Sequence, residues 1–416
     1  MTIEQEPPLR DAPETRTAPW KQLFPWSTDE LPVDDTLAAL RRLVEVLRRA
    51  GFSRTASVPR PGKLRHLPLD LANLTQAFKN GNNLFHSTAM PWLYQTLVNR
   101  SHPVAMRLHR LFHLCLPAPP RTIDSIISET LLSELLKLGI LVDTERGICS
   151  QIMITPYGEQ LFLSDPTESK SRDDFVYMGR ISFAVPDAVA LTASTSEQPE
   201  QGRLLDLGCG SGILSISLAN RFEEVVGVDI NDRCVEYAEL NAALAGTDNC
   251  QFANSDLYSQ VNGTFDVIAT NPPCAWAMNE GEDSIARHGG GEYGSGIPSR
   301  ILAGAFDYLR PEGVVYCAVS CPIIQGRPYV LDLMQRSYDK LGAEIRIFPV
   351  FDEFDYARRK HYRRHDISTI VRYLAIVRPS TRPSISFGRI DSLRAFSYRI
   401  RTALPKLLAR VNRGQS

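Results

Sequence analysis

The sequence lacks the features of a membrane-embedded, secreted or disulfide-bonded protein. No window approaches the ~18 uninterrupted apolar residues that a membrane-spanning helix needs, and the start of the chain is acidic and proline-rich with no apolar leader core. The eight cysteines are scattered and none forms a Cys-x-x-Cys pair, so we interpret them as reduced thiols rather than disulfides or metal ligands. We therefore expect a cytoplasmic protein with no membrane partner and no metal.

The chain also lacks an excess of either charge. Lys and Arg number 46, Asp and Glu number 47, and the formal net charge is −1. Proteins dedicated to nucleic acids usually carry a clear basic excess, so this balance favours a small-molecule or amino-acid substrate over DNA or RNA. With 416 residues the chain exceeds what one hydrophobic core usually holds, which predicts more than one domain.

Composition and periodicity divide the sequence into four parts. Residues 1–30 are rich in Pro, Glu and Thr and are expected to form a disordered or loosely docked tail. Residues 31–170 are expected to form a mostly helical domain, and residues 175–380 follow a polar linker and are expected to form an α/β domain. Residues 381–416 predict a basic C-terminal helix that packs on the protein, with a membrane or RNA tether as the alternative.

Within the N-terminal domain, apolar spacing predicts helices over Val33–Arg49, 69–99 and 102–115. A later stretch is typical of a winged helix, with a helix over Asp124–Leu138, a stop at Gly139 and β-type runs at Ile140–Thr144 and Cys149–Thr155. Such a module can dock nucleic acid, or it can mediate dimerisation or cover a substrate. Glu129 and Glu134 accompany one lysine on the predicted helix, which favours the second interpretation and leaves a homodimer open.

The α/β domain shows strands alternating with helical segments. The expected strands lie near 203–207, 224–229, 250–253, 265–270, 313–319, 344–348 and 368–377. Alternation of this kind predicts a Rossmann-like fold, a mainly parallel seven-stranded sheet covered by helices on both faces.

The first of these strands leads into a glycine-rich turn. Residues 203–212 read Arg-Leu-Leu-Asp-Leu-Gly-Cys-Gly-Ser-Gly. Glycines let a ligand approach the backbone closely, and open α/β sheets bind ligands beyond the carboxyl ends of their strands. A dinucleotide site is the alternative, but it calls for Gly-x-Gly-x-x-Gly, and Asp206 would repel a pyrophosphate while suiting a cationic sulfonium.

A second motif reads Asp266-Val-Ile-Ala-Thr-Asn271-Pro272-Pro273. The Asn271 side-chain oxygen and the Pro272 carbonyl can accept two N–H bonds of a planar nitrogen, and proline holds that carbonyl in place. Pre-positioning of this kind supplies roughly 7–11 kcal/mol without a strong base. In this order the two motifs resemble the class I S-adenosylmethionine-dependent methyltransferases, in their Asn-Pro-Pro branch of release-factor glutamine and amino-methyltransferase-like enzymes.

The resemblance covers about residues 175–320 and implies S-adenosyl-L-methionine as cofactor. It implies that Asp229 accepts bonds from the ribose hydroxyls and that Asp256 holds the adenine amino group; the alternative for Asp256 is a helix N-cap. The implied catalytic residues are Asn271, Pro272 and Pro273. The implied cofactor-binding residues are Tyr177, Asp206, Gly208, Gly210, Gly212, Asp229, Ile230, Asp256, Leu257 and Asn271.

The sequence departs from the family pattern at Cys274, where an aromatic residue normally stacks on a flat substrate. This departure favours a non-aromatic acceptor nitrogen. The polar, glycine-rich segment that follows is interpreted as a lid, with a solvated surface loop as the alternative. Its carboxylates favour a cationic substrate, and the expected substrate-binding residues are Glu280, Glu282, Asp283, His288 and Glu292.

The expected activity is thus N-methylation of a planar nitrogen on a small molecule or amino-acid side chain, with a guanidino group ahead of a carboxamide. The alternatives are an amino-methyltransferase of rRNA, tRNA or DNA bases, a protein glutamine methyltransferase, and a non-catalytic relative.

Overall fold

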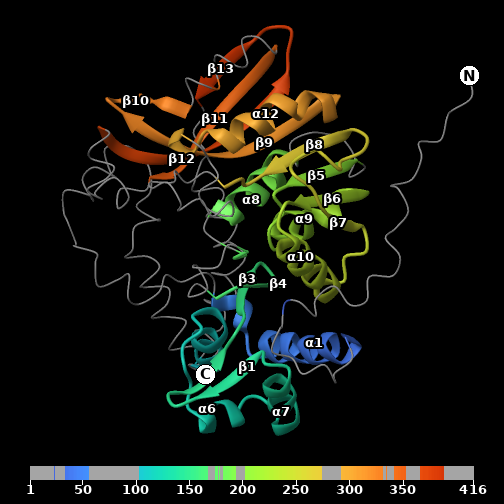
Figure 1. Ribbon diagram of the computed structural model, residues 1–416, viewed down its shortest axis with the longest axis vertical. Helices are drawn as coiled ribbons and strands as arrows, with labels where there is room; N and C mark the ends of the chain where they lie inside the picture. Colours follow the sequence, from blue (N-terminus) through green and yellow to red (C-terminus); the bar gives the residue numbers. More distant parts are fainter. Residues whose placement is uncertain are drawn as a thin grey trace, which may run out of the picture.

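The computed structural model describes residue 23 and residues 33–55, 103–166, 174–176, 178, 181–193, 202–273, 292–330, 334, 342–352 and 366–387. The predicted helix at 69–99 lies outside these residues, as do the predicted tail except Leu23 and the last 29 residues of the predicted C-terminal helix, 388–416. In the described parts of the chain, no helix has the length and apolar character needed to cross a membrane. Figure 1 shows the N-terminal helices and hairpins gathered at one end of the molecule and a large sheet at the other.

The N-terminal part is built from short helices and two hairpins. Its elements are α1 (Val33–Arg49), η2 (Phe52–Thr55), α5 (Pro103–Leu108), the π-helical turn η3 (His109–His113), α6 (Pro120–Asp124), α7 (Glu129–Lys137), β1 (Leu141–Thr144), β2 (Gly147–Ser150), β3 (Met153–Tyr157) and β4 (Gln160–Ser164). The helices predicted over Val33–Arg49 and 102–115 are confirmed. Leucines on one face of α1 are fully buried, as its amphipathic pattern predicts.

The winged-helix region differs in detail from the prediction. The prediction of a single helix over Asp124–Leu138 was wrong. Helix α6 ends at Asp124, and a new helix, α7, begins after Ser128, which caps it by accepting a hydrogen bond from the Leu131 N–H. Gly139 has a φ of 65° and follows α7, as predicted for a helix stop. The predicted run Cys149–Thr155 is divided between β2 and β3, because β2 pairs with β1 whereas β3 turns back to pair with β4.

The nine-stranded sheet has the strand order β13-β11-β12-β9-β8-β5-β6-β7, with β10 paired to β9. Its strands are β5 (Arg203–Leu207), β6 (Glu224–Asp229), β7 (Cys250–Asn254), β8 (Phe265–Thr270), β9 (Leu309–Ile324), β10 (Arg327–Pro328), β11 (Ala343–Asp352), β12 (Ile367–Pro379) and β13 (Ser384–Phe387). The strands β7, β6, β5, β8 and β9 are mutually parallel, and β12 runs antiparallel to both of its neighbours. The seven predicted strands and the mainly parallel Rossmann-like α/β fold are confirmed, and the sheet has nine strands rather than seven because β10 and β13 also join it.

Strand β13 is a correction, because it lies within the stretch predicted as a basic helix. Residues 384–387 read Ser-Ile-Ser-Phe, which alternates polar and apolar side chains as an edge strand does. They pair in parallel with β11. A strand of four residues shows too little alternation to be predicted beside the helical pattern of the arginines that follow it.

Helices cover both faces of the sheet. They are α8 (Ile181–Ala193), α9 (Ile213–Leu218) with the turn η5 (Ala219–Arg221), α10 (Asp232–Ala245), and α12 (Gly296–Tyr308), which follows the turn η6 (Glu292–Gly294). Leu204 packs in a cluster with α8 and α9, while its neighbour Leu205 packs in the cluster that contains α12. The strands are therefore buried on both sides, as parallel sheets require.

Helix α10 also belongs to the core of the N-terminal part. Its Tyr237, Leu240 and Leu244 pack in one cluster with side chains of α1, α7 and the first hairpins. Figure 1 shows α10 reaching from the sheet toward α1. The N-terminal part is thus packed directly against a helix that starts at the end of strand β6.

Candidate active site

The carboxyl ends of β5, β6 and β8 meet at one edge of the sheet. Strand β5 lies between the other two, and the chain crosses from one side of it to the other, which makes this a topological switch point. The backbone N–H groups of Gly208 and Cys209 donate to the Val228 carbonyl. The Thr270 hydroxyl donates to the Leu207 carbonyl at 2.6 Å. Because Asn271 follows Thr270 in the chain, these bonds hold the glycine turn directly beside Asn271.

The glycines of the turn have two different roles. Gly208 and Gly210 have φ values of +73° and +54°, and a Cβ on either would meet no atom within 4 Å. At Gly212, with φ +76°, a Cβ would lie 3.0 Å from the Cβ of Ala238 on α10. Gly212 therefore allows close helix packing, whereas Gly208 and Gly210 leave open space above the turn that a ligand can fill.

Asp206 lies beneath the turn rather than on its surface. Its side chain is 1% exposed, and its Oδ2 accepts hydrogen bonds from the Ser215 hydroxyl at 2.7 Å and the Ser215 N–H at 3.1 Å. Burial raises the pKa of Asp206 to about 7, the bonds from Ser215 oppose this rise, and the charge of Asp229 adds to it. The Oδ2 atom of Asp206 is thus held by Ser215 beneath the turn, and Asp206 stays a prediction as a cofactor-binding residue.

Asp229 and Ile230 follow strand β6 at the same edge. The Asp229 carboxylate accepts hydrogen bonds from the Gly210 N–H at 2.9 Å and the Asn231 N–H at 3.0 Å. Burial raises the pKa of Asp229, and these backbone bonds oppose the rise. Ile230 is 49% exposed, one of two large apolar side chains exposed among the described residues. An acceptor and an apolar surface suit the ribose and the adenine of a nucleoside.

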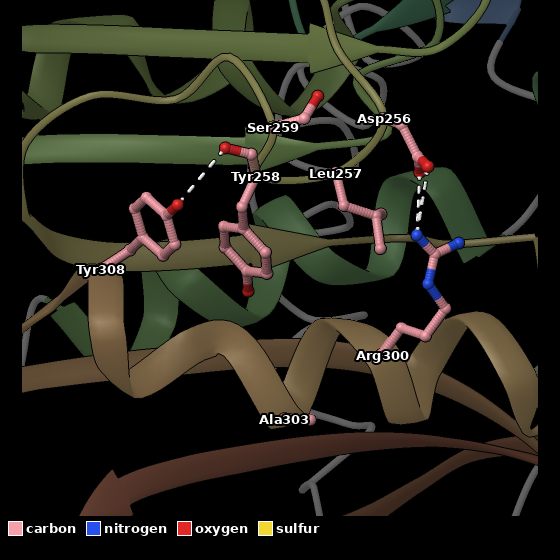
Figure 2. A pocket seen from close by; sticks show the side chains of 7 residues that line it. All are labelled: Asp256, Leu257, Tyr258, Ser259, Arg300, Ala303 and Tyr308. Atoms are coloured by element: carbon pink, nitrogen blue, oxygen red, sulfur yellow. Dashed lines mark hydrogen bonds and ion pairs between the residues drawn. The ribbon is translucent and has the colours of Figure 1, made fainter.

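Figure 2 shows Asp256 and its surroundings, a hollow between the loop after β7 and helix α12. The Asp256 carboxylate forms an ion pair with Arg300, with Nη2–Oδ1 and Nη2–Oδ2 distances of 3.2 and 3.1 Å. Both side chains are about half exposed, so the pair orients Asp256 at little energetic gain and leaves its oxygens accessible. The hollow has a volume of about 420 Å³ and is lined by Asp256, Leu257, Tyr258, Ser259, Arg300, Ala303 and Tyr308.

The structure of the loop after β7 excludes one of the two roles considered for Asp256. Residues 255–264 contain no helix, so the helix N-cap alternative for Asp256 was wrong. Leu257 has a positive φ of 50°, a conformation that costs a non-glycine residue about 1–3 kcal/mol and clusters at binding sites.

Asn271 lies at the end of β8, next to the glycine turn. Its Nδ2 donates a hydrogen bond to the hydroxyl of Ser182 on α8 at 3.2 Å. This contact directs the amide nitrogen toward α8, so the side-chain oxygen is on the other side of the amide group. Pro272 is buried and Pro273 is partly exposed.

Several predicted site residues cannot be placed. Tyr177, Glu280, Glu282, Asp283 and His288 lie outside the described residues. Glu292 begins the turn η6, directly before α12. Within the described chain, no group of three His, Cys, Asp or Glu side chains could hold a metal ion.

The structure adds residues that the sequence reasoning missed. Ser182 contacts Asn271, Ser215 holds Asp206, and Arg300 pairs with Asp256. Serine and arginine are too common for a local pattern to single them out, since each contact joins segments far apart in the chain. Asn231 is different: it follows the strand-ending Asp229-Ile230 and caps α10, a position that a helix start signal indicates.

Comparison with known proteins agrees with this geometry. Residues 185–320 match the family described as "Methyltransferase small domain". Over 116 residues the chain is 39% identical to a provisionally named protein N5-glutamine methyltransferase of Methanocaldococcus jannaschii, a match that covers 27% of this chain and 58% of that protein. Over 121 residues it is 36% identical to ribosomal RNA small subunit methyltransferase C of Salmonella arizonae, covering 28% and 35% respectively.

The chain therefore spans less than two thirds of the length of either relative. Among solved structures, Trm5b of Pyrococcus abyssi matches with a TM-score of 0.37 and 17% identity, over 57% of this chain and 62% of that one.

The strand order and the glycine turn are those expected of the class I S-adenosylmethionine-dependent methyltransferases that the sequence resembles. Within that class, residues 185–320 match the methyltransferase small-domain family. The cofactor of this class is S-adenosyl-L-methionine, and the open glycine turn, the acceptor Asp229 and the exposed Ile230 fit it.

Proposed function

We propose that this chain transfers the methyl group of S-adenosyl-L-methionine to a planar nitrogen of an amino-acid side chain or a small molecule. The observation that carries the proposal is the position of Asn271 beside the open glycine turn. Strands β5 and β8 are neighbours, and Thr270 is in register with Leu207. A donor over Gly208 and Gly210 therefore lies next to an amide and a rigid carbonyl that can hold an acceptor.

The cofactor would be held by residues from three strand ends. Asp229 would accept hydrogen bonds from the ribose hydroxyls, Ile230 would pack on the adenine, and Asp256 would accept a bond from the adenine amino group. Tyr177 stays a prediction for the methionine end. When bound, the cofactor supplies an electrophilic methyl group on a positively charged sulfur.

The acceptor would be positioned by Asn271 and Pro272. Because Ser182 accepts a hydrogen bond from Asn271 Nδ2, the Asn271 Oδ1 is the atom left to accept an N–H from the substrate. With the Pro272 carbonyl as second acceptor, both hydrogens are held and the nitrogen lone pair points at the methyl carbon. Methyl transfer would form a C–N bond while the C–S bond breaks, and the nitrogen would release one proton. These acceptors also stabilise the positive charge that develops on the nitrogen.

We place the acceptor among carboxamide and guanidino groups for three reasons. One relative is named as a protein glutamine methyltransferase, and Cys274 replaces the aromatic residue that would stack on a base. The winged-helix region is also poorly suited to phosphates, because residues 120–150 contain five acidic and three basic side chains. On α7, Glu134 pairs with Arg42 of α1, which places that side of the helix against the protein.

The test is incubation of the full chain with methyl-labelled cofactor and separate acceptor pools. The pools are free amino acids and small metabolites, peptides and proteins containing Gln or Arg, and ribosomal and transfer RNA. We expect label in one of the first two pools and its loss in Asn271→Ala, which should still bind cofactor. Label in RNA that disappears at high salt would instead support a base methyltransferase, the activity for which the second relative is named.

A further inference from the structure

A buried polar stripe runs along α10 and faces the N-terminal part of the chain. Arg233, Tyr237 and Asn241 are spaced four residues apart, which places them on one face of the helix. They are 7%, 0% and 1% exposed. Buried polar side chains need partners, and this stripe finds them on and after strand β4 and around the site.

Asp165, one residue after β4, is the first partner. Its carboxylate accepts hydrogen bonds from Arg233 Nη2 at 2.6 Å, Arg233 Nε at 3.1 Å and the Tyr237 hydroxyl at 3.0 Å. It also accepts the backbone N–H of Val176 at 2.9 Å. One carboxylate thus joins the end of the N-terminal part, helix α10 and the segment that leads to α8.

Asn241 makes the second connection between helix α10 and strand β4. Its side-chain oxygen accepts the Leu163 N–H of β4 at 2.8 Å, and its Nδ2 donates to the Leu163 carbonyl at 2.9 Å. The same Nδ2 donates to the Ser211 carbonyl within the glycine turn at 2.8 Å. A single buried amide therefore connects β4 to the turn on which the cofactor would rest.

The segment held by Asp165 borders the site as well. The Asp174 carbonyl accepts a hydrogen bond from Asn231 Nδ2, and the Asn231 backbone N–H donates to the Asp229 carboxylate. Met178 packs in one cluster with Ile213, the first residue after the glycine turn. Ser182 then contacts Asn271. The described residues between 174 and 182 thus follow the carboxyl edge of the sheet from β6 to β8.

We propose that Asn241 and Asp165 are positioning residues through which β4 of the N-terminal part sets the shape of the cofactor site. The proposal rests on the proposed function, since it takes the glycine turn as the cofactor site. The N-terminal part would then support the cofactor site structurally, independently of any role in recognising a substrate.

The main test is the affinity of Asn241→Ala for S-adenosyl-L-methionine, measured by calorimetry well below its melting temperature. We expect the Kd to rise about tenfold, within the usual range of coupling between distinct sites. Asn249→Ala is the matched control, because Asn249 Nδ2 also donates to two backbone carbonyls, those of Ala219 and Phe222, away from the carboxyl edge. It should lower the melting temperature and leave the Kd unchanged.

A second pair of variants, one test and one control, is used if Asn241→Ala fails to fold. Asp165→Asn keeps the shape and one acceptor oxygen, and we expect a several-fold rise in Kd. Its control is Glu224→Gln, which weakens the Arg203–Glu224 pair at the opposite edge of the sheet. Hydrogen exchange without cofactor gives an independent readout: the amides of Val176 and Gly212 should exchange faster in the two test variants and not in the controls.

A folded Asn241→Ala or Asp165→Asn variant with wild-type Kd and unchanged exchange at Val176 and Gly212 would overturn the proposal. Failure of the proposed function would look different, because the wild-type chain itself would then bind no S-adenosyl-L-methionine.

Discussion

Two pairs of acidic side chains at opposite edges of the same sheet, Glu224 with Asp266 and Asp206 with Asp229, have different kinds of partner. At the amino edge, Glu224 accepts from Arg203 Nε at 2.7 Å, and Asp266 accepts from Arg310 Nη1 at 2.8 Å. The Asp266 carboxylate also accepts the Arg203 backbone N–H. Each of these two carboxylates has a cation beside it, and these partly exposed pairs connect neighbouring strands.

At the carboxyl edge, Asp206 and Asp229 form no ion pair with any lysine or arginine that the structure describes. Their partners are backbone N–H groups, the Ser215 hydroxyl and the Cys234 thiol, and the charge of Asp229 raises the pKa of Asp206. Two nearby acids without a cation reduce the stability of a fold. The amino edge is therefore arranged for stability, while the carboxyl edge keeps negative charge available for a cationic ligand.

The largest effect that should separate the edges is that of Asp229→Ala on cofactor affinity. Loss of hydrogen bonds from two ribose hydroxyls to a charged acceptor costs about 3 kcal/mol, on the order of hundredfold in Kd. Glu224→Ala at the amino edge should leave the Kd of S-adenosyl-L-methionine unchanged. Calorimetric titration of both variants checks this; equal affinities would refute the ribose role of Asp229.

Gly210→Ala should have the next largest effect. The added methyl group enters the open space above the turn, and overpacking against bound cofactor costs about 2 kcal/mol, roughly thirtyfold in Kd. Gly246→Ala is the matched control, because Gly246 also has a positive φ, of +70°, and open space around a Cβ, but it lies at the C-terminal end of α10. Both variants should lose similar stability, and only the first should lose affinity. Equal affinities in thermal-shift titrations would show that the cofactor does not cover Gly210.

Ser182→Ala tests the acceptor side of the carboxyl edge. Loss of the hydrogen bond that orients Asn271 costs about 1 kcal/mol, roughly fivefold in kcat, with the cofactor Kd unchanged. Ser217→Ala is the control, because the Ser217 hydroxyl donates only within helix α9, to the Ile213 carbonyl. Steady-state kinetics with the identified acceptor measures the difference. A drop in cofactor affinity with normal kcat would place Ser182 in the cofactor site instead.

Much of the carboxyl edge could be predicted because its signals are local. The strand ends at Leu207, Asp229 and Thr270 and the glycine turn are each contained in about ten consecutive residues. The contacts that shape the edge are not local. Ser182 meets Asn271 across 89 positions, and Asn241 meets Leu163 across 78. Only the fold brings these residues together, so single-sequence reasoning could not find them.

The errors have similar physical causes. The break between α6 and α7 depends on a hydrogen bond to Ser128, which competes with an apolar pattern that continues through the break. Strand β13 is four residues long and exists through its pairing with β11. The partner of Asp206 was missed for a related reason: Ser215, whose hydroxyl and N–H donate to Asp206 Oδ2, lies nine residues further along, in the helix after the glycine turn.

The smallest predicted effect is a pH dependence confined to the carboxyl edge. Because the folded pKa of Asp206 is raised to about 7 from 3.8, the folded chain holds this proton more tightly than the unfolded chain. The contribution of Asp206 to stability is therefore greatest below about pH 4 and is lost as the pH rises toward 7. A bound sulfonium favours the ionised carboxylate, so binding should lower this pKa.

Cofactor affinity should consequently rise with pH up to about 7 and then level off. A lowering of the Asp206 pKa by about half a unit corresponds to roughly a threefold change in Kd. Asp206→Asn keeps an acceptor for Ser215 but cannot titrate, so its Kd should be flat between pH 5.5 and 8. Asp266→Asn, at the amino edge beside Arg310, should retain the wild-type slope. If Asp206→Asn retained that slope as well, the charge sensed by the cofactor would have to lie on another group, with Asp229 the first to examine.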